Sequence, residues 1–134
     1  MTPEVIVTGS RQWPPHAARI IWQMLAAHNP SLVVHGGCPE GADDIAEAWS
    51  RRSEVDSRIV RARWTRDTGG KLNRGAGHAR NSRMLELYPD APVLAFPFGK
   101  ASGTRGCIRR AVELGRAVLV FNTAGQLVPA PEWF

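Results

Sequence analysis

Short apolar segments alternate along this chain with segments whose apolar residues recur at helical spacing. The apolar segments predict strands, because they are short, largely apolar and bounded by turn residues. They cover residues 4–8, 31–35, 58–63, 91–96 and 117–121. The segments between them predict helices over residues 16–28, 43–52, 78–88 and 105–114. This alternation is typical of an α/β protein with parallel strands.

The fourth and fifth apolar segments, APVLAF and AVLVF, contain no polar residue, as strands covered by helices on both faces of a sheet require. Right-handed crossovers then predict a doubly wound parallel five-stranded sheet in a three-layer α/β/α arrangement, with strand order 3-2-1-4-5. The third segment alternates in polarity, which favours an edge. No internal repeat or linker composition is present, so residues 1–134 are expected to form one domain.

Four predictions concern helix ends, the chain end and one long loop. Thr104 is expected to cap the N-terminus of the fourth helix, and Gly115 to follow its last residue. Residues 122–134 are expected to form a tail whose apolar end, Trp133 and Phe134, packs on the body or on a partner subunit. Residues 64–77 contain four glycines and several charges, which predicts a mobile loop of a length that is often functional.

A ligand site in such a sheet lies outside the carboxyl ends of the strands, where the strand order reverses. Here that point falls between the first and fourth strands. The loops that follow the carboxyl ends of the first four strands combine glycine with hydroxyl or charged residues. They comprise residues 9–11, 36–44, 64–80 and 98–104. A glycine turn that enters a helix presents backbone N–H groups and a positive dipole end, which suits a phosphate. Neither the G-x-G-x-x-G nor the P-loop pattern is present.

The charge balance favours an anionic partner. The formal net charge is +5, and of the 17 basic residues only Lys71 and Lys100 are lysine. Arginine suits paired phosphate contacts, although an arginine-rich composition can equally reflect a GC-rich genome. A nucleotide, a nucleic acid and an acidic protein all fit this balance.

The sequence also indicates where in the cell the protein is expected and whether it is expected to bind a metal or a cofactor. No apolar run approaches the roughly 18 residues of a membrane helix, and no secretory signal opens the chain. Two cysteines make no disulfide framework, so the cytoplasm is expected. His35, Cys38, His78 and Cys107 lack the paired C-x-x-C spacing of a zinc site, so we expect no metal and no cofactor.

Four motifs, VTGSR, HGGCPEGAD, W…GHARNSRML and AFPFGKASGTRGCIRRA, resemble the SLOG superfamily in their order and spacing, and more narrowly its YspA-like branch of bacteria and phages. That superfamily includes the Lonely Guy phosphoribohydrolases and DNA-processing protein A. The resemblance extends from residue 5 to about residue 120 and implies a Rossmann-like domain that binds a nucleotide or a related ligand. It also implies homo-oligomer formation.

The resemblance implies a ligand site made of four groups of residues. Ser102, Gly103 and Thr104 match a phosphate-binding turn, and Asp43 is expected to face a sugar or base. The complete implied site consists of Gly9, Ser10, Arg11, Gly36, Gly37, Gly41, Asp43, Arg80, Asn81, Ser102, Gly103 and Thr104.

One departure from the family pattern concerns catalysis. The phosphoribohydrolases carry a Glu three residues after the Gly-Thr pair, where it acts with the Arg of the third helix; here Cys107 stands in its place. A thiol cannot replace a carboxylate in stabilising an oxocarbenium-like centre. The first hypothesis is therefore a module that senses or sequesters a nucleotide-derived ligand. A nucleotide N-glycosidase using Glu40, Asp43 or Asp44 and a single-stranded DNA-binding protein are the alternatives.

Several side chains have two interpretations at this level. Cys107 is either a reactive thiol activated by a helix N-terminus or a small packed side chain. Trp64 and Trp13 are candidates for base stacking or for packing, whereas Trp22 and Trp49 are expected in the core.

Overall fold

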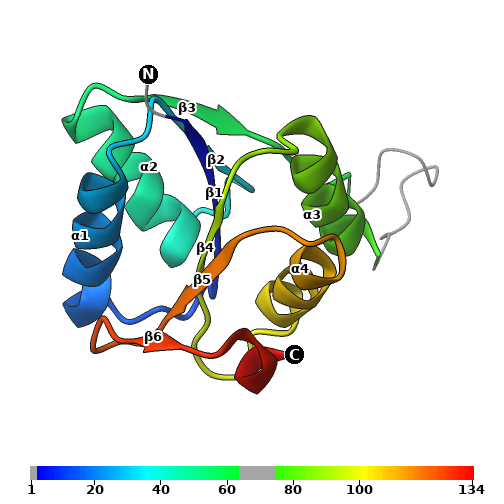
Figure 1. The fold of residues 1–134 in the computed structure, drawn as a ribbon. Helices are drawn as coiled ribbons and strands as arrows, with labels where there is room; N and C mark the ends of the chain where they lie inside the picture. The colour runs from blue at the N-terminus through cyan, green and yellow to red at the C-terminus, as the bar shows by residue number, and fades with distance from the viewer. Residues whose placement is uncertain (1–2, 64–74) are drawn as a thin grey trace.

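The computed structural model describes residues 3–63 and 75–134, and its centre is a six-stranded sheet (Figure 1). The strand order is β3-β2-β1-β4-β5-β6. The strands are β1 (Glu4–Gly9), β2 (Leu32–His35), β3 (Asp56–Ile59), β4 (Val93–Phe96), β5 (Val118–Phe121) and β6 (Leu127–Val128). The helices are α1 (Ala18–His28), α2 (Ala42–Arg52), α3 (Ala76–Leu87) and α4 (Ser102–Glu113), with 3₁₀ turns at Pro15–Ala17 and Ala130–Trp133.

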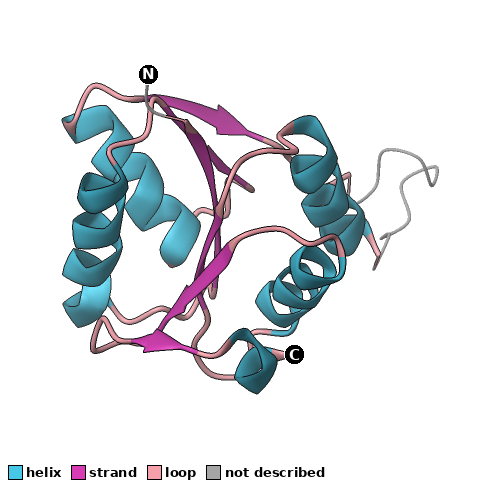
Figure 2. Ribbon diagram, viewed as in Figure 1, coloured by secondary structure: helices cyan, strands magenta, loops and turns pink. Residues whose placement is uncertain are grey.

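The first five strands are parallel in the predicted order, and β1 pairs with both β2 and β4. The helical pairs α1–α2 and α3–α4 cover opposite faces of this sheet (Figure 2). β1 explains the division, because its side chains alternate between faces. Val5 and Val7 pack with α1 and α2, whereas Ile6 packs with Met84 and Leu85 of α3.

The prediction of a purely parallel five-stranded sheet is wrong at its C-terminal edge, because β6 pairs antiparallel with β5. A tight turn makes this return possible: Asn122 Oδ1 accepts the N–H groups of Ala124 and Gln126, each at 3.0 Å. The sequence predicts a tail here, because two residues are too few to produce a visible strand pattern. The tail does pack on the body, since the Arg105 guanidinium lies 4.4 Å from the Trp133 ring centroid.

Other differences lie at element ends. β3 ends at Ile59 rather than at residue 63, and the predicted loop over residues 64–77 falls mostly outside the described residues. Thr104 is not the N-cap of α4, because that helix already begins at Ser102; Ala101 occupies the cap position with a φ of 45°. Gly115 does follow the helix with a φ of 73°, as predicted. Among the described helices, none has both the length and the apolar character needed to cross a bilayer.

Candidate functional site

A cavity of about 430 Å³ opens at the carboxyl ends of β1 and β4, where the strand order reverses. This volume lies within the range of small-molecule pockets. We call it the cleft, and it is lined by Val7, Thr8, Gly9, Ser10, Arg11, Gln12, Gly36, Cys38, Asp43, Gly77, His78, Arg80, Asn81, Met84, Lys100, Ala101, Ser102, Gly103 and Thr104. The structure thus brings together loops that are up to 95 residues apart in the chain (9 to 104), all on one edge of the sheet.

All the residues of the sequence-predicted site except Gly37 and Gly41 line the cleft. These two glycines shape the second loop from outside it. Gly37 donates its N–H to His35 Nδ1 at 3.0 Å. Gly41 lies directly against the first loop, and the next residue, Ala42, donates its N–H to Ser10 O at 3.1 Å. The first and second loops are therefore held together by backbone contact.

The N-terminus of α4 faces the cleft and is open to an anion. Ser102 and Gly103 are exposed, and the first turn of the helix contains no acidic residue. Apart from its chain neighbours and the backbone of its own helix, no described atom lies within 4 Å of the position that a Cβ on Gly103 would occupy. Unpaired N–H groups and the helix dipole thus give this point a positive potential, and Lys100 adds to it.

Arg80 connects the two sides of the cleft. Its Nη1 donates to Gly36 O at 3.0 Å, and its Nε donates to Asn81 Oδ1 at 2.7 Å. Asn81 Nδ2 in turn donates to Gly103 O at 3.3 Å. This chain of hydrogen bonds fixes the guanidinium between the second loop and the start of α4, so its charge is preorganised beneath the cleft.

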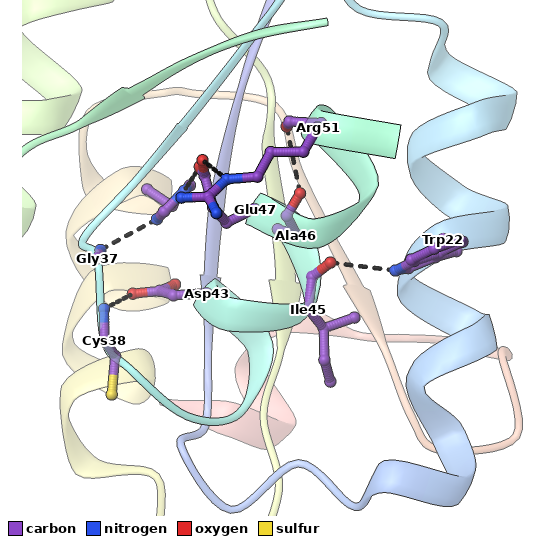
Figure 3. Close-up of polar contacts among 10 residues, drawn as sticks. Trp22, Gly37, Cys38, Asp43, Ile45, Ala46, Glu47 and Arg51 are labelled. Atoms are coloured by element: carbon purple, nitrogen blue, oxygen red, sulfur yellow. Dashed lines mark hydrogen bonds and ion pairs between the residues drawn. The ribbon is translucent and has the colours of Figure 1, made fainter. Parts of the chain in front are cut away.

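Asp43 is the buried carboxyl group of the cleft, with 7% of its surface exposed. Its Oδ2 accepts the N–H of Cys38 at 3.2 Å (Figure 3). Burial raises the pKa of Asp43 above its ordinary value, although His35, the Cys38 N–H and Arg80 act in the opposite direction. Burial therefore opposes ionisation of this side chain.

Replacing Asp43 by Asn is expected to stabilise the protein at neutral pH. A carboxyl group whose pKa is raised by folding contributes fully to the stability of the folded protein at pH values below its unfolded pKa, which is near 3.8. This contribution is lost as the pH rises through the pKa of the folded state. Asn keeps an acceptor for the Cys38 N–H but carries no charge. Thermal denaturation of Asp43→Asn should show a higher Tm than wild type at about pH 7.5, with the gain shrinking towards about pH 4. A gain that grew on acidification would contradict this assignment.

A buried histidine supports the second loop from below. His35 is 1% exposed; its Nδ1 accepts the Gly37 N–H, so its Nε2–H donates to Glu47 Oε1 at 2.8 Å. Arg51 Nε also donates to Glu47, at 3.1 Å (Figure 3). Partial burial of Glu47 opposes ionisation, but hydrogen bonds from His35, Ser57 and Arg51 outweigh it and lower its pKa. Both His35 nitrogens are thus occupied, and no group of three metal-ligating side chains occurs among the described residues.

Two open interpretations are decided by burial. Cys107 is 1% exposed, and burial raises its pKa to about 11, so the reactive-thiol interpretation is wrong at neutral pH. Trp13 is 2% exposed, donates its Nε1–H to Ala17 O at 2.9 Å and meets Phe96 edge-on. It is therefore unavailable for base stacking, whereas Trp64 lies outside the described residues. Trp49 is buried as predicted, and half-buried Trp22 packs against the same core.

Sequence reasoning missed several residues that line the cleft. Lys100 and Cys38 belong to the predicted loops, and Gln12 directly follows the first of them, but the family resemblance assigns none of the three to the site. His78 enters from the first turn of α3, one turn from the Arg80–Asn81 pair. His78 follows Gly77 at the start of α3, and this position is the sequence signal that indicates a residue of the site.

The fold and this cleft define a Rossmann-like α/β protein with a polar cleft at the switch point of a doubly wound sheet. Residues 3–66 match the family model described as "YspA, cpYpsA-related SLOG family". The chain is 40% identical over 128 residues to the Gene 61 protein of Mycobacterium phage D29, covering 88% of this chain and 95% of that protein. It belongs to the YspA-related SLOG family, as its motifs predict.

The fold is also similar to a solved structure. DNA processing protein A (DprA) from Streptococcus pneumoniae matches with a TM-score of 0.69 at 18% identity. The match covers 90% of this chain and 50% of the DprA chain, so this chain spans half the length of that protein. At this identity the similarity concerns the fold.

Proposed function

We propose that this protein binds a nucleotide or a nucleotide-derived ligand in the cleft, and that it senses or sequesters this ligand in the cytoplasm. The observation that carries the proposal is the convergence of the open α4 N-terminus, the fixed Arg80 guanidinium and the buried Asp43 on one cavity of suitable size. Membership of the SLOG family and the DprA-like fold support a nucleotide-related ligand.

The two helix N-termini near the cleft suggest how the ligand would lie. The first turn of α2 already carries Asp43 and Asp44, which complement its dipole and repel a second anion. The first turn of α4 carries no acid. A phosphate would therefore sit over Gly103 and Thr104, and Asp43 would accept a hydrogen bond from a sugar hydroxyl or a base.

Sequestration rather than turnover is favoured by the environment of Cys107. This residue occupies the position of the phosphoribohydrolase Glu, but it is buried and does not line the cleft. Its thiol is protonated at neutral pH, since its pKa is about 11. It therefore supplies neither a negative charge nor a proton acceptor to a ligand.

A ligand screen tests the proposal. AMP, ADP-ribose and cyclic nucleotides at millimolar concentration are compared by thermal denaturation, with calorimetry for any that stabilise. A ligand at about 100 times its Kd contributes about 2.7 kcal/mol, which corresponds to a rise in Tm of roughly 10 °C for a chain of this size. If none of these compounds changed the Tm, the proposal would fail.

One observation favours a nucleotide N-glycosidase as a second candidate. A carboxyl whose pKa is raised by burial suits a general acid that protonates a leaving base, and Asp43 is such a group in the cleft. Glu40 and Asp44, the other carboxylates considered, are exposed and do not line it. The same screen separates the candidates when it is followed by chromatography for free base. Release that Asp43→Asn abolishes identifies the enzyme, whereas stabilisation without release identifies the binding module.

A further inference from the structure

A second cavity, of about 250 Å³, lies between α3 and α4. We call it the α3–α4 groove. His78 and Asn81 line both this groove and the cleft, so these two side chains form the wall that separates the two cavities. The groove therefore adjoins the cleft along α4.

The groove is polar, and its far end is basic. Its other lining residues include Ser82 of α3 and Arg109, Arg110 and Glu113 of α4. Arg110 lies 3.5 Å from Glu113 in an exposed ion pair, which contributes little and is easily exchanged for another anion. Arg109 is exposed and has no hydrogen-bond or ion-pair partner within the described part of the chain. Two guanidinium groups are thus available against one carboxylate.

The spacing along α4 determines what size of ligand could use both cavities. Gly103 and Arg110 are seven residues apart, which corresponds to about 10 Å at the helical rise of 1.5 Å per residue. A single phosphate cannot reach both positions. A stacked nucleotide strand rises about 3.4 Å along its axis for each phosphate, and successive phosphates lie farther apart than this rise because the strand winds, so this distance corresponds to at most about three nucleotide steps.

The wall between the cavities joins α3 to α4. The ring of His78 lies against the backbone of Gly106, where a Cβ would come within 2.9 Å of the ring. Asn81 completes the wall, because its Nδ2 donates to Gly103 O and its Oδ1 accepts from Arg80 Nε. His78 is exposed, so a ligand that used both cavities would pass over the exposed side of its ring.

We propose that the ligand of this protein is a short linear nucleotide chain of two to four units, whose terminal phosphate sits at the α4 N-terminus and whose further phosphates reach Arg109 and Arg110 through the α3–α4 groove. This inference rests on the proposed function and specifies its ligand class. Ser82 and His78 supply hydrogen-bonding groups between the two charged ends.

The test is a length series of 5′-phosphorylated oligodeoxyadenylates, d(pA), d(pA)₂, d(pA)₃, d(pA)₄ and d(pA)₁₀, measured by calorimetry. Affinity is expected to rise by about tenfold or more between d(pA) and d(pA)₃, because each added charged contact contributes about that factor. It should then level off by d(pA)₄. A further rise to d(pA)₁₀ would keep the groove as a subsite and identify a long single strand as the source of the chain.

The variant Arg109→Gln/Arg110→Gln should remove the gain for d(pA)₃ and leave the affinity for d(pA) unchanged. Its dependence on salt should also weaken, by about 0.7 in the log–log slope for each lost phosphate contact. The matched control is Arg19→Gln/Arg52→Gln, which removes the same charge from exposed positions on α1 and α2, across the sheet.

The outcomes separate this inference from the proposed function. If d(pA) binds and d(pA)₃ binds no more tightly, the groove is not a subsite and the inference is overturned while the cleft proposal stands. If the control reduces d(pA)₃ binding as much as the arginine pair does, the gain comes from net charge and the inference is likewise overturned. If the nucleotides of the broader screen also fail to bind, the proposed function falls as well.

Discussion

Gly103→Asp is expected to abolish nucleotide binding while leaving the fold intact. The side chain has room, because no described atom beyond its chain neighbours and the backbone of its own helix lies within 4 Å of the added Cβ, and Gly103 lies in the first turn of α4. A carboxylate there complements the helix dipole, so stability should stay the same or rise by about 0.3–1 kcal/mol. The same charge occupies the position that we assign to a phosphate. Loss of two charge-assisted contacts alone predicts a decrease in affinity on the order of a hundredfold.

Gly103→Ala is the matched control for this variant, because it adds a Cβ without a charge. It should raise helix stability by roughly 0.5–1 kcal/mol and lower the affinity far less than the Asp variant does. Calorimetry with the best ligand from the screen and thermal denaturation measure the two effects separately. Equal affinity of Gly103→Asp and wild type would show that the phosphate does not lie at the α4 N-terminus.

The largest effect on stability is expected from Gly41→Ala. Gly41 has a φ of +74° and a ψ of −146°, close to a region that is available almost only to glycine, which costs a non-glycine residue about 1–3 kcal/mol. A Cβ would also lie 2.3 Å from Arg11 Cα and 2.4 Å from Ser10 O. These are backbone atoms of the first loop and cannot turn aside. We therefore expect a loss of about 3 kcal/mol or more in the free energy of unfolding.

Gly115→Ala separates the cost of a positive φ from the cost of a steric clash with the added Cβ. Gly115 has a φ of +73°, yet no described atom beyond its chain neighbours lies within 4 Å of the position that its Cβ would take, so only the conformational cost of about 1 kcal/mol applies. Denaturant titration of both variants measures the difference. If the two variants lost the same stability, contact between the first and second loops would not contribute, and the explanation given for Gly41 would be wrong.

Residues in and around the cleft differ in whether they contribute to the stability of the fold or to ligand affinity. Gly41 and Gly37 shape the second loop without lining the cavity, and His35 with Glu47 supports that loop from below. The N-terminus of α4 at Gly103 and the guanidinium group of Arg80 give the cavity itself a positive potential. Changes at the first group should therefore lower stability and affinity together, whereas Gly103→Asp should lower affinity without lowering stability.

The amino-acid sequence by itself determined the order of the elements, the parallel pairing of five strands and the edge at which the cleft lies. These follow from local properties. Apolar runs such as APVLAF must be covered on both faces, glycine turns end the strands, and right-handed crossovers leave few topologies. For the same reason the loops that carry Arg11, Asp43, Arg80 and Gly103 could be assigned to one edge before any contact was known.

Only the tertiary structure decided which of these residues face the cavity and in what state. Gly41 and Gly103 look alike in the sequence, but one lies against backbone and the other faces open space. Trp13 and Cys107 had two interpretations, and burial decided both. The return of β6 depended on a turn and on the free edge of β5, which no local pattern reveals in two residues. Burial, contact and pKa depend on residues distant in the chain, so they exist only once the fold has brought those residues together.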